Sequence, residues 1–412
     1  MIFMIRKPII TVLGHIDAGK TKLLDSIRGT AIAERESGGI TQHIGATEVP
    51  IRVVQKIAGP LMQKYGFELK IPGLLFIDTP GHEAFANLRK RGGSIADLAV
   101  LVVDINKGLQ PQTIEAIEIL KSYKTPFIVA ANKIDSVHGW IKTEGSFTDS
   151  IAKQNQSVVV ELDKKLYELV GQLYSHGFAC ERFDRIKDFT KEIAIIPVSA
   201  KFFEGIAEVL LFLAGLSQRY LGKNIDISED ELPRGTVLEI KEEKGLGKTI
   251  DVILYEGKLS VGQEIAIGGK NGVITTKIRA LLVPGHMADI RASSKEKFES
   301  AKDVFAAAGV KIAAPSLEDA VAGSPLLLKS DAAIKEIAQE LERVKIDTDA
   351  LGPVLKTDAL GSLEAIVKLL ETKKIKVRKA DVGAVSKRDI NEAIAVKEKD
   401  ELLGVVFGFR TK

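Results

Sequence analysis

The sequence predicts an α/β protein: a mostly parallel sheet with helices on both faces, followed by an antiparallel β-barrel and a small α/β/α domain. Apolar runs alternate with amphipathic stretches through the first half of the 412 residues. Gly/Asn turns and period-2 alternation replace them after about residue 223, and strand–helix alternation returns from Gly352. Continuous apolar strands separated by helices are typical of a parallel sheet, whereas alternation with tight turns is typical of antiparallel pairing.

The first half contains five short apolar runs, each ending in polar or small residues, which we expect to be strands of one sheet. They are IITVLGH (9–15), LLFIDTPG (74–81), LAVLVVDIN (98–106), PFIVAANKID (126–135) and AIIPVSAK (194–201). A helix is expected directly after the first run, at KTKLLDSIRG. The more polar segment 141–192 is interpreted as an insertion that holds a long helix over 158–174. In open parallel sheets, functional residues lie at the carboxyl ends of the strands.

The second half divides into two further units. KTIDVILYEG (248–257) has period-2 alternation, and GGKNG (268–272) reads as a hairpin turn, which together predict the barrel. Residues 331–346 form one amphipathic helical pattern, and a βαβαβ pattern follows it. The expected division is 1–223 for the first domain, 230–329 for the barrel, 330–347 for a linker helix and 352–412 for the third domain.

Composition excludes several classes of protein. The net charge of +3 gives no global basic signature, so nucleic-acid contact is neither demanded nor excluded. The single cysteine, Cys180, permits neither an internal disulfide nor a thiolate zinc site, and we expect a buried or inert thiol. No apolar run is long enough for a membrane span, so we expect a cytoplasmic protein without membrane contact.

Residues Gly14–Thr21 match the pattern G-x-x-x-x-G-K-[ST] between an expected strand and an expected helix. Glycines let successive backbone N–H groups turn inward towards phosphate oxygens, and the helix N-terminus adds positive potential. Lys20 brings a positive charge to the β- and γ-phosphates, while the Thr21 hydroxyl is a ligand for Mg²⁺. The pattern predicts a phosphate-binding loop.

Two residues of the segment DTPGH extend this site. Asp78 ends an apolar run and is placed like an acid that holds Mg²⁺ through water. Gly81 has no side chain to block its N–H, which can therefore approach a γ-phosphate.

The base is expected to be guanine because of NKID, residues 132–135. The Asp135 carboxylate can accept from both the N1–H and the exocyclic amine of guanine, a donor pair that adenine lacks. Ser199, Ala200 and Lys201 follow another strand and fit a backbone contact to the guanine carbonyl. Because these motifs occur in this order, each at a strand end, they predict a GTPase that uses GTP, GDP and Mg²⁺.

Segment SGGITQHIGAT, residues 37–47, has neither a helix nor a strand period. The Thr41 hydroxyl can complete the Mg²⁺ shell when a γ-phosphate is present, which predicts an order–disorder switch.

These motifs resemble those of translational GTPases, and most of all the family of initiation factor 5B of archaea and eukaryotes, the counterpart of bacterial initiation factor 2. The resemblance is carried by GHIDAGKTKLLDSIRG, SGGITQHIGAT, DTPGHEAF, NLRKRGGSIADLAVLVVDINKGLQPQT and NKID. It is dense in the first half and looser beyond it.

The resemblance implies roles for individual residues. The phosphate-binding set becomes Asp17, Ala18, Gly19, Lys20, Thr21 and Lys22 together with Gly81. Asp17, with the Gly39 carbonyl, is expected to coordinate K⁺ or Na⁺, and Lys133 to lay its alkyl stem over the base beside Asn132. Ile16 and Ile40 resemble the apolar pair that flanks a catalytic histidine. That histidine is His82, which stands where small signalling GTPases carry a water-orienting glutamine.

The resemblance also implies partners. It implies a monomeric factor that binds both ribosomal subunits and rRNA, promotes subunit joining and hydrolyses GTP slowly without the ribosome. Family members carry a further C-terminal barrel for initiator tRNA, for which we find no candidate before Lys412, and we expect a truncated sequence. Contacts with initiator tRNA and other initiation factors are expected through that missing part.

Two other functions are compatible with the motifs. The first is a GTP-gated binding module that uses the nucleotide to position the second and third domains. The second is an elongation-type GTPase, against which the linker helix and the α/β third domain argue.

Overall fold

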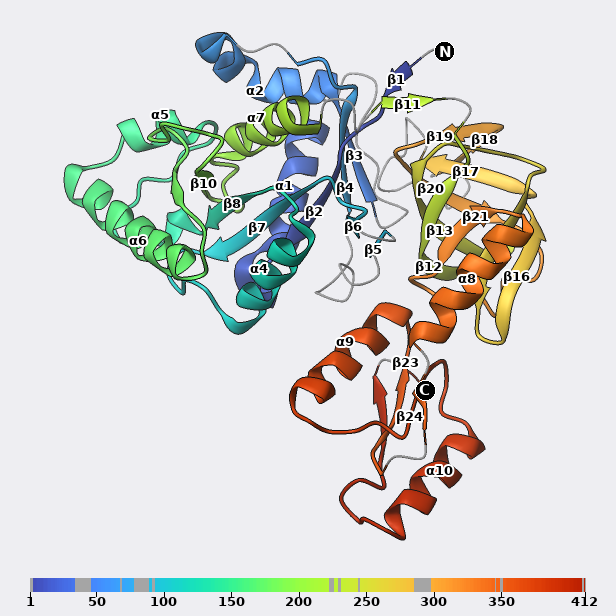
Figure 1. The fold of residues 1–412 in the computed structure, drawn as a ribbon. Helices are drawn as coiled ribbons and strands as arrows, with labels where there is room; N and C mark the ends of the chain where they lie inside the picture. Colours follow the sequence, from blue (N-terminus) through green and yellow to red (C-terminus); the bar gives the residue numbers. More distant parts are fainter. Residues whose placement is uncertain are drawn as a thin grey trace.

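The structure is a computed structural model that describes residues 3–33, 46–66, 69–77, 89–90, 93–221, 226–228, 231–243, 245–284, 298–344, 346–348, 351–409 and 411. Three sheets account for most of its strands, and the chain visits them in sequence order (Figure 1). The first holds the expected nucleotide motifs.

The first sheet has seven strands in the order β3-β4-β2-β7-β8-β10-β9, and all neighbours are parallel except β3 and β4. In sheet order the strands are Ala46–Pro50, Gly73–Ile77, Ile9–Leu13, Leu98–Asp104, Phe127–Asn132, Ile193–Val198 and Cys180–Arg182. The central strands are buried along their whole length, which explains why they read as continuous apolar runs. The mostly parallel α/β class predicted from the sequence is confirmed.

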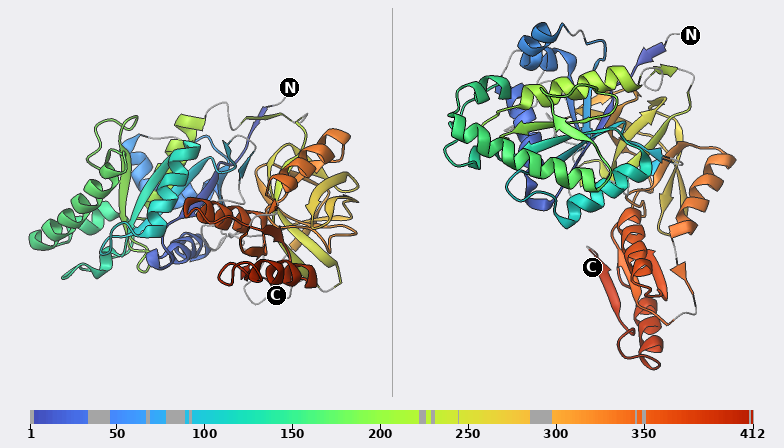
Figure 2. Two further views of the ribbon diagram at one scale, coloured as in Figure 1. Left: turned by 60° about the horizontal axis from the view of Figure 1, so that its bottom comes forward. Right: turned by 60° about the vertical axis from the view of Figure 1, so that its left-hand side comes forward.

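Helices cover this sheet (Figures 1 and 2). They are α1 (Lys20–Ala33), α2 (Ile51–Tyr65), α4 (Pro111–Tyr123), α5 (Phe147–Ala152), α6 (Gln156–Ser175) and α7 (Ile206–Leu216), with short turns η1 (Ile16–Ala18), η2 (Ile134–Ser136) and η3 (Ser217–Leu221). The long helix predicted over 158–174 is present as α6, which buries Leu162, Leu166 and Leu169 along one face.

The second sheet has eight strands, all paired antiparallel, in the order β16-β15-β21-β12-β13-β20-β17-β18. They are Gly272–Lys277, Glu264–Gly269, Pro325–Leu328, Arg234–Glu243, Gly247–Glu256, Ala308–Ala313, Ala280–Pro284 and Phe298–Ala301. The predicted hairpin at GGKNG is confirmed, because Gly269 pairs with Gly272 across a two-residue turn. The sheet curls round one apolar core, as expected for a barrel.

Short two-stranded ladders complete the first two units. They pair β1 (Phe3–Ile5) with β11 (Asp226–Ser228), β14 (Lys258–Ser260) with β19 (Asp303–Phe305), and β5 (Arg89–Lys90) with β6 (Gly93–Ser94).

The third sheet has the order β22-β24-β23-β25, with parallel β24, β23 and β25. Its strands are Ile346–Asp347, Lys379–Val382, Val354–Thr357 and Val406–Phe409, and its helices are α9 (Leu360–Thr372) and α10 (Lys387–Lys397). Helix α8 (Asp331–Val344) precedes it, and one apolar cluster joins α8 to strands of the second and third sheets. The helix and its apolar face are thus confirmed.

Three details differ from the sequence prediction. The helix predicted over 331–346 ends at Val344, because Ile346 pairs with Ala380 as part of β22. Residues 46 and 47, placed in a segment without periodicity, begin β3, where Thr47 is fully buried. The edge strands β3, β9 and β22 are too short, or too polar, to give a period-2 signal.

Candidate nucleotide-binding site

The P-loop connects β2 to α1 at the carboxyl edge of the first sheet. Two of its residues must be glycine. A Cβ at Gly14, whose φ is +137°, would lie 2.2 Å from the Val102 carbonyl oxygen, and one at Gly19, with φ of +93°, would lie 2.4 Å from Asn132 Nδ2. The backbone thus has a positive φ at both glycines of the motif, as the tight turn of a phosphate-binding loop requires.

Lys20 begins α1, and its ammonium lies inside the loop. The Nζ donates to the carbonyl oxygens of Gly14 and His15, both at 2.8 Å. Burial lowers the pKa of Lys20 below its ordinary value, and the nearby Asp17 carboxylate offsets part of this effect. The cation is thus held at the point where the motif requires a partner for phosphate.

The remaining P-loop residues differ in how exposed they are. Ala18 is buried, whereas the predicted metal and phosphate residues Asp17, Thr21 and Lys22 are exposed. Thr21 and Lys22 lie in the first turn of α1, where backbone N–H groups lack helical partners.

Asn132, at the end of β8, joins three loops. Its Nδ2 donates to the carbonyl oxygen of Ala18 in the P-loop at 2.8 Å. Its Oδ1 accepts from the backbone N–H of Lys133 at 2.8 Å and from that of Ala200 at 3.0 Å. The side chain is 2% exposed, so these bonds are shielded from water. The predicted base residues are therefore brought against the P-loop.

Asp135 and Ser199 face each other across this loop cluster. Ser199 Oγ donates to Asp135 Oδ1 at 2.7 Å, which fixes the carboxylate that was predicted to read guanine. Ser26 of α1 donates to the Ala200 carbonyl oxygen and so ties the same segment to the helix. Lys201 is exposed, with its Nζ 5.2 Å from the centre of the Phe202 ring.

Lys133 is held by Asp104, the last residue of β7. The Nζ–Oδ2 distance is 2.8 Å, and Asp104 Oδ1 accepts from the backbone N–H of Asn106 at 3.0 Å. Burial alone would raise the pKa of the Asp104 carboxyl, but the bonds from Lys133 and Asn106 outweigh it, and the net pKa is lowered. This acid stays ionised beside residues 132–136, which we call the base loop.

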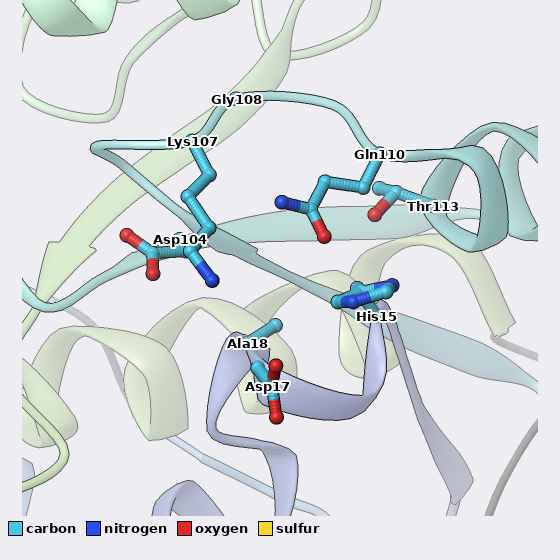
Figure 3. A pocket seen from close by; sticks show the side chains of 8 residues that line it. All are labelled: His15, Asp17, Ala18, Asp104, Lys107, Gly108, Gln110 and Thr113. Atoms are coloured by element: carbon cyan, nitrogen blue, oxygen red, sulfur yellow. The ribbon is translucent and has the colours of Figure 1, made fainter.

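The segment after β7 lies over the P-loop (Figure 3). Across a small cleft, His15, Asp17 and Ala18 face residues that precede or begin α4: Asp104, Lys107, Gly108, Gln110 and Thr113. The Ile16 backbone N–H donates to Gln112 Oε1 at 3.1 Å, which links the two segments.

Two buried acids, Glu204 and Glu208, follow the Ser199–Lys201 segment, and the Glu204 backbone pairs with that of Ser199. Glu204 is fully buried, and its carboxylate accepts from Trp140 Nε1 and from the backbone N–H and hydroxyl of Thr143. Glu208, in the first turn of α7, accepts at Oε1 from the Thr148 backbone N–H at 3.3 Å, while its Oε2 has no hydrogen-bond partner among the described residues. Burial raises the pKa of Glu208 to about 7.

Several predicted site residues lie outside the described residues. They are Gly39, Ile40, Thr41, Asp78, Gly81 and His82. The Mg²⁺ ligands Thr41 and Asp78, the cation ligand Gly39 and the catalytic His82 therefore stay predictions. In the part of the chain that the structure describes, no group of three or more His, Cys, Asp or Glu side chains is arranged to hold a metal ion.

The structure also bears on Cys180 and on the character of the helices. Cys180 is buried, as expected, and burial raises the pKa of its thiol to about 12, which leaves it unreactive. Within the described ranges, no helix has the length and apolar character needed to cross a membrane.

Three residues that hold the site together, Asp104, Glu204 and Ser26, are not among the predicted site residues. Asp104 ends a fully buried run and so gave the same strand-end signal as Asp78. Glu204 and Ser26 gave no local signal, because their partners are far away in sequence.

Matches to known protein families show the class of protein to which the chain belongs. Residues 6–219 match the family of the elongation factor Tu GTP-binding domain, and residues 328–412 match the translation-initiation factor 2 family. The chain is therefore a GTPase of the translation-factor class, which binds GTP and GDP and hydrolyses GTP.

Relatives give the particular family. The chain is 54% identical over 414 residues to a probable translation initiation factor IF-2 of Thermococcus sibiricus, spanning 99% of this chain and 69% of the relative. It is 57% identical to that of Pyrococcus abyssi, spanning 95% of this chain and 40% of the relative. A crystal structure of GDP-bound aIF5B from Aeropyrum pernix matches with a TM-score of 0.87 and 48% identity, over 99% of this chain and 69% of that one. The chain belongs to the archaeal translation initiation factor IF-2 family, as the sequence motifs predicted.

The buried Glu208 carboxyl predicts a pH dependence of stability. Since its pKa rises from 4.5 to about 7 on folding, the folded state keeps a proton that the unfolded state has lost between these values. The free energy of unfolding should thus fall as pH rises through this window. Glu208→Gln, which mimics the protonated acid, should be about 3 kcal/mol more stable than the parent above pH 7 and equal to it near pH 4.5.

Thermal unfolding of both proteins across this pH range measures the difference. Glu168→Gln, at an exposed position of α6, is the matched control and should follow the parent. A constant difference between Glu208→Gln and the parent at all pH values would contradict the assignment.

Proposed function

We propose that this GTPase acts on the ribosome, where it promotes the joining of subunits during initiation and hydrolyses GTP when the ribosome triggers it. The observation that carries the proposal is the gathering of the P-loop, Asn132–Asp135 and Ser199–Lys201 at one edge of the first sheet. Membership of the initiation-factor family supports the ribosomal role.

Residues of two kinds bind the nucleotide in this proposal. Phosphate oxygens are bound by Asp17–Lys22 and the Gly81 backbone. Guanine is read by Asp135 and by the Ser199–Lys201 backbone, with the Lys133 stem over the ring and Asn132 holding the loops in place. The Lys20 ammonium inside the loop supports the first set, and the Ser199–Asp135 bond supports the second.

Thr21, Thr41 and, through water, Asp78 would hold Mg²⁺. The cation would neutralise the charge of the β- and γ-phosphates. The exposed Thr21 hydroxyl in the first turn of α1 supports this set. Asp17 and the Gly39 carbonyl would hold K⁺ or Na⁺, since a bare carboxylate beside phosphates is repulsive. The exposure of Asp17 and its position next to Lys20 support that role.

In the proposed hydrolysis, His82 hydrogen-bonds the attacking water and aligns it with the γ-phosphorus. The ribosome moves this imidazole inward, so that turnover by the free protein is slow. A change of bound nucleotide would be transmitted to the second sheet through β4, the strand that leads to Asp78. Supporting this path, Leu75 and Ile77 of β4 share an apolar cluster with Leu238 and Tyr255.

The wider assignment completes the proposal. We infer a cytoplasmic monomer divided as 1–223, 230–329, 330–347 and 352–412, contacting rRNA of both subunits. Initiator tRNA and other initiation factors are further partners in this proposal. Helix α8 shares one apolar cluster with the second and third sheets, which supports a role for this linker helix in transmitting movement between them.

Asp135→Asn tests base recognition. The amide presents a donor where guanine also donates but where xanthine carries an oxygen. GDP affinity should fall by roughly two to four orders of magnitude, and xanthosine diphosphate should bind more tightly than GDP. Titrations with fluorescent derivatives of both nucleotides measure this, with Glu168→Gln as the control. Unchanged GDP affinity would exclude Asp135 from the base contact.

His82→Ala tests the catalytic assignment. Nucleotide affinity should stay within about threefold of the parent, while ribosome-stimulated turnover should fall by about 100-fold or more, in line with loss of a positioned proton acceptor. Phosphate release with and without ribosomes is the measurement, and His176→Ala, at the C-terminal end of α6, is the control. Full stimulation in His82→Ala would remove the catalytic role, and no stimulation of the parent would favour a GTP-gated binding module.

A further inference from the structure

We propose that Asp104 is a positioning residue, which orders Lys133 before the nucleotide binds and thereby slows its dissociation. The inference rests on the proposed nucleotide site, since Lys133 is one of its base-contacting residues. Asp104 itself does not touch the nucleotide in this proposal and acts only through the base loop.

The sheet register brings Asp104 to this position. In the parallel pair of β7 and β8, Asp104 lies opposite Asn132, the residue that precedes Lys133. Asp104 is 7% exposed, and its carboxylate uses both oxygens: Oδ2 pairs with Lys133 Nζ at 2.8 Å, and Oδ1 accepts from Asn106. The acid is fixed by the strand and the turn that follows it.

A second connection holds the backbone of the same loop. Asn106 Nδ2 donates to Ser136 Oγ at 2.8 Å, and Ser136 Oγ donates to the Lys133 carbonyl oxygen at 2.6 Å. Lys133 has a left-handed φ of +68°, a conformation that a non-glycine residue adopts only when its surroundings hold it there. Residues 104–106 therefore hold Lys133 at both its side chain and its backbone.

These contacts contribute little to folding but bear directly on binding. The Lys133 side chain is 36% exposed, and a partly exposed ion pair of this kind is worth little to the stability of the fold. A lysine stem that must lie over a base loses its rotamer freedom on binding, and that loss is smaller when a partner has already restricted it. Removing the partner should therefore weaken binding and leave the fold intact.

The test measures dissociation of a fluorescent GDP derivative from the full chain by stopped flow. Asp104→Asn keeps an oxygen for the Asn106 N–H but loses the charge that holds Lys133, and we expect dissociation about five- to tenfold faster. The protein should stay folded, with only a small fall in the thermal midpoint of unfolding, because folding lowers the pKa of the Asp104 carboxyl. Asp188→Asn is the matched control, because Asp188 Oδ1 also accepts from the backbone N–H two residues on, at Thr190.

A double-mutant cycle separates positioning from a general structural effect. In a Lys133→Met background, which keeps a stem but no charge, Asp104→Asn should cause no further acceleration. Ser136→Ala, at an exposed position, removes the backbone connection and should accelerate dissociation about two- to threefold; it keeps the inference testable if Asp104→Asn fails to fold.

Parental dissociation rates in Asp104→Asn and Ser136→Ala would overturn the inference, as would an undiminished effect of Asp104→Asn in the Lys133→Met background. Failure of the parent protein to bind fluorescent GDP is a different result, which would overturn the proposed site and the inference with it.

Discussion

The Asn132 carboxamide donates to the P-loop and accepts from the two base-loop segments, so that three connections far apart in sequence form one surface. Each bond is an ordinary one, worth about 1 kcal/mol net. Their value lies in geometry, because a buried amide that lost any one partner would leave a polar group unsatisfied away from water. The same side chain also excludes a Cβ at Gly19, so Asn132 can make these bonds only when residue 19 is glycine.

This contact is possible because the strands are parallel and end together. Asp104, Asn132 and Val198 are in register across β7, β8 and β10, so the segment that follows each strand emerges at the same edge. The sheet therefore places the base loop, the acid that holds Lys133 and the Ser199–Lys201 segment side by side at the same edge. Glu204, whose backbone pairs with that of Ser199, accepts from the Thr143 backbone N–H and so fastens this segment to the 141–192 insertion.

Much of this follows from sequence, since long apolar runs, glycine spacing and strand-end motifs are local signals. The central strands, α6, the GGKNG hairpin and the third βαβαβ unit were all predicted from such signals. The sequence could not show that Asn132 is a joint between loops, because its partner Ala18 is 114 residues away. Short edge strands such as β22 also lacked a signal, since tertiary pairing rather than periodicity ends α8 at Val344.

We expect the P-loop, Asn132–Ser136 and Ser199–Phe202 to act as one guanine-nucleotide site. This can be measured by amide hydrogen exchange of the full chain with GDP, with ADP and without nucleotide. GDP should slow exchange in all three segments together, whereas ADP at the same concentration should leave them at the nucleotide-free rate. Protection by GDP confined to the P-loop, or equal protection by ADP, would contradict it.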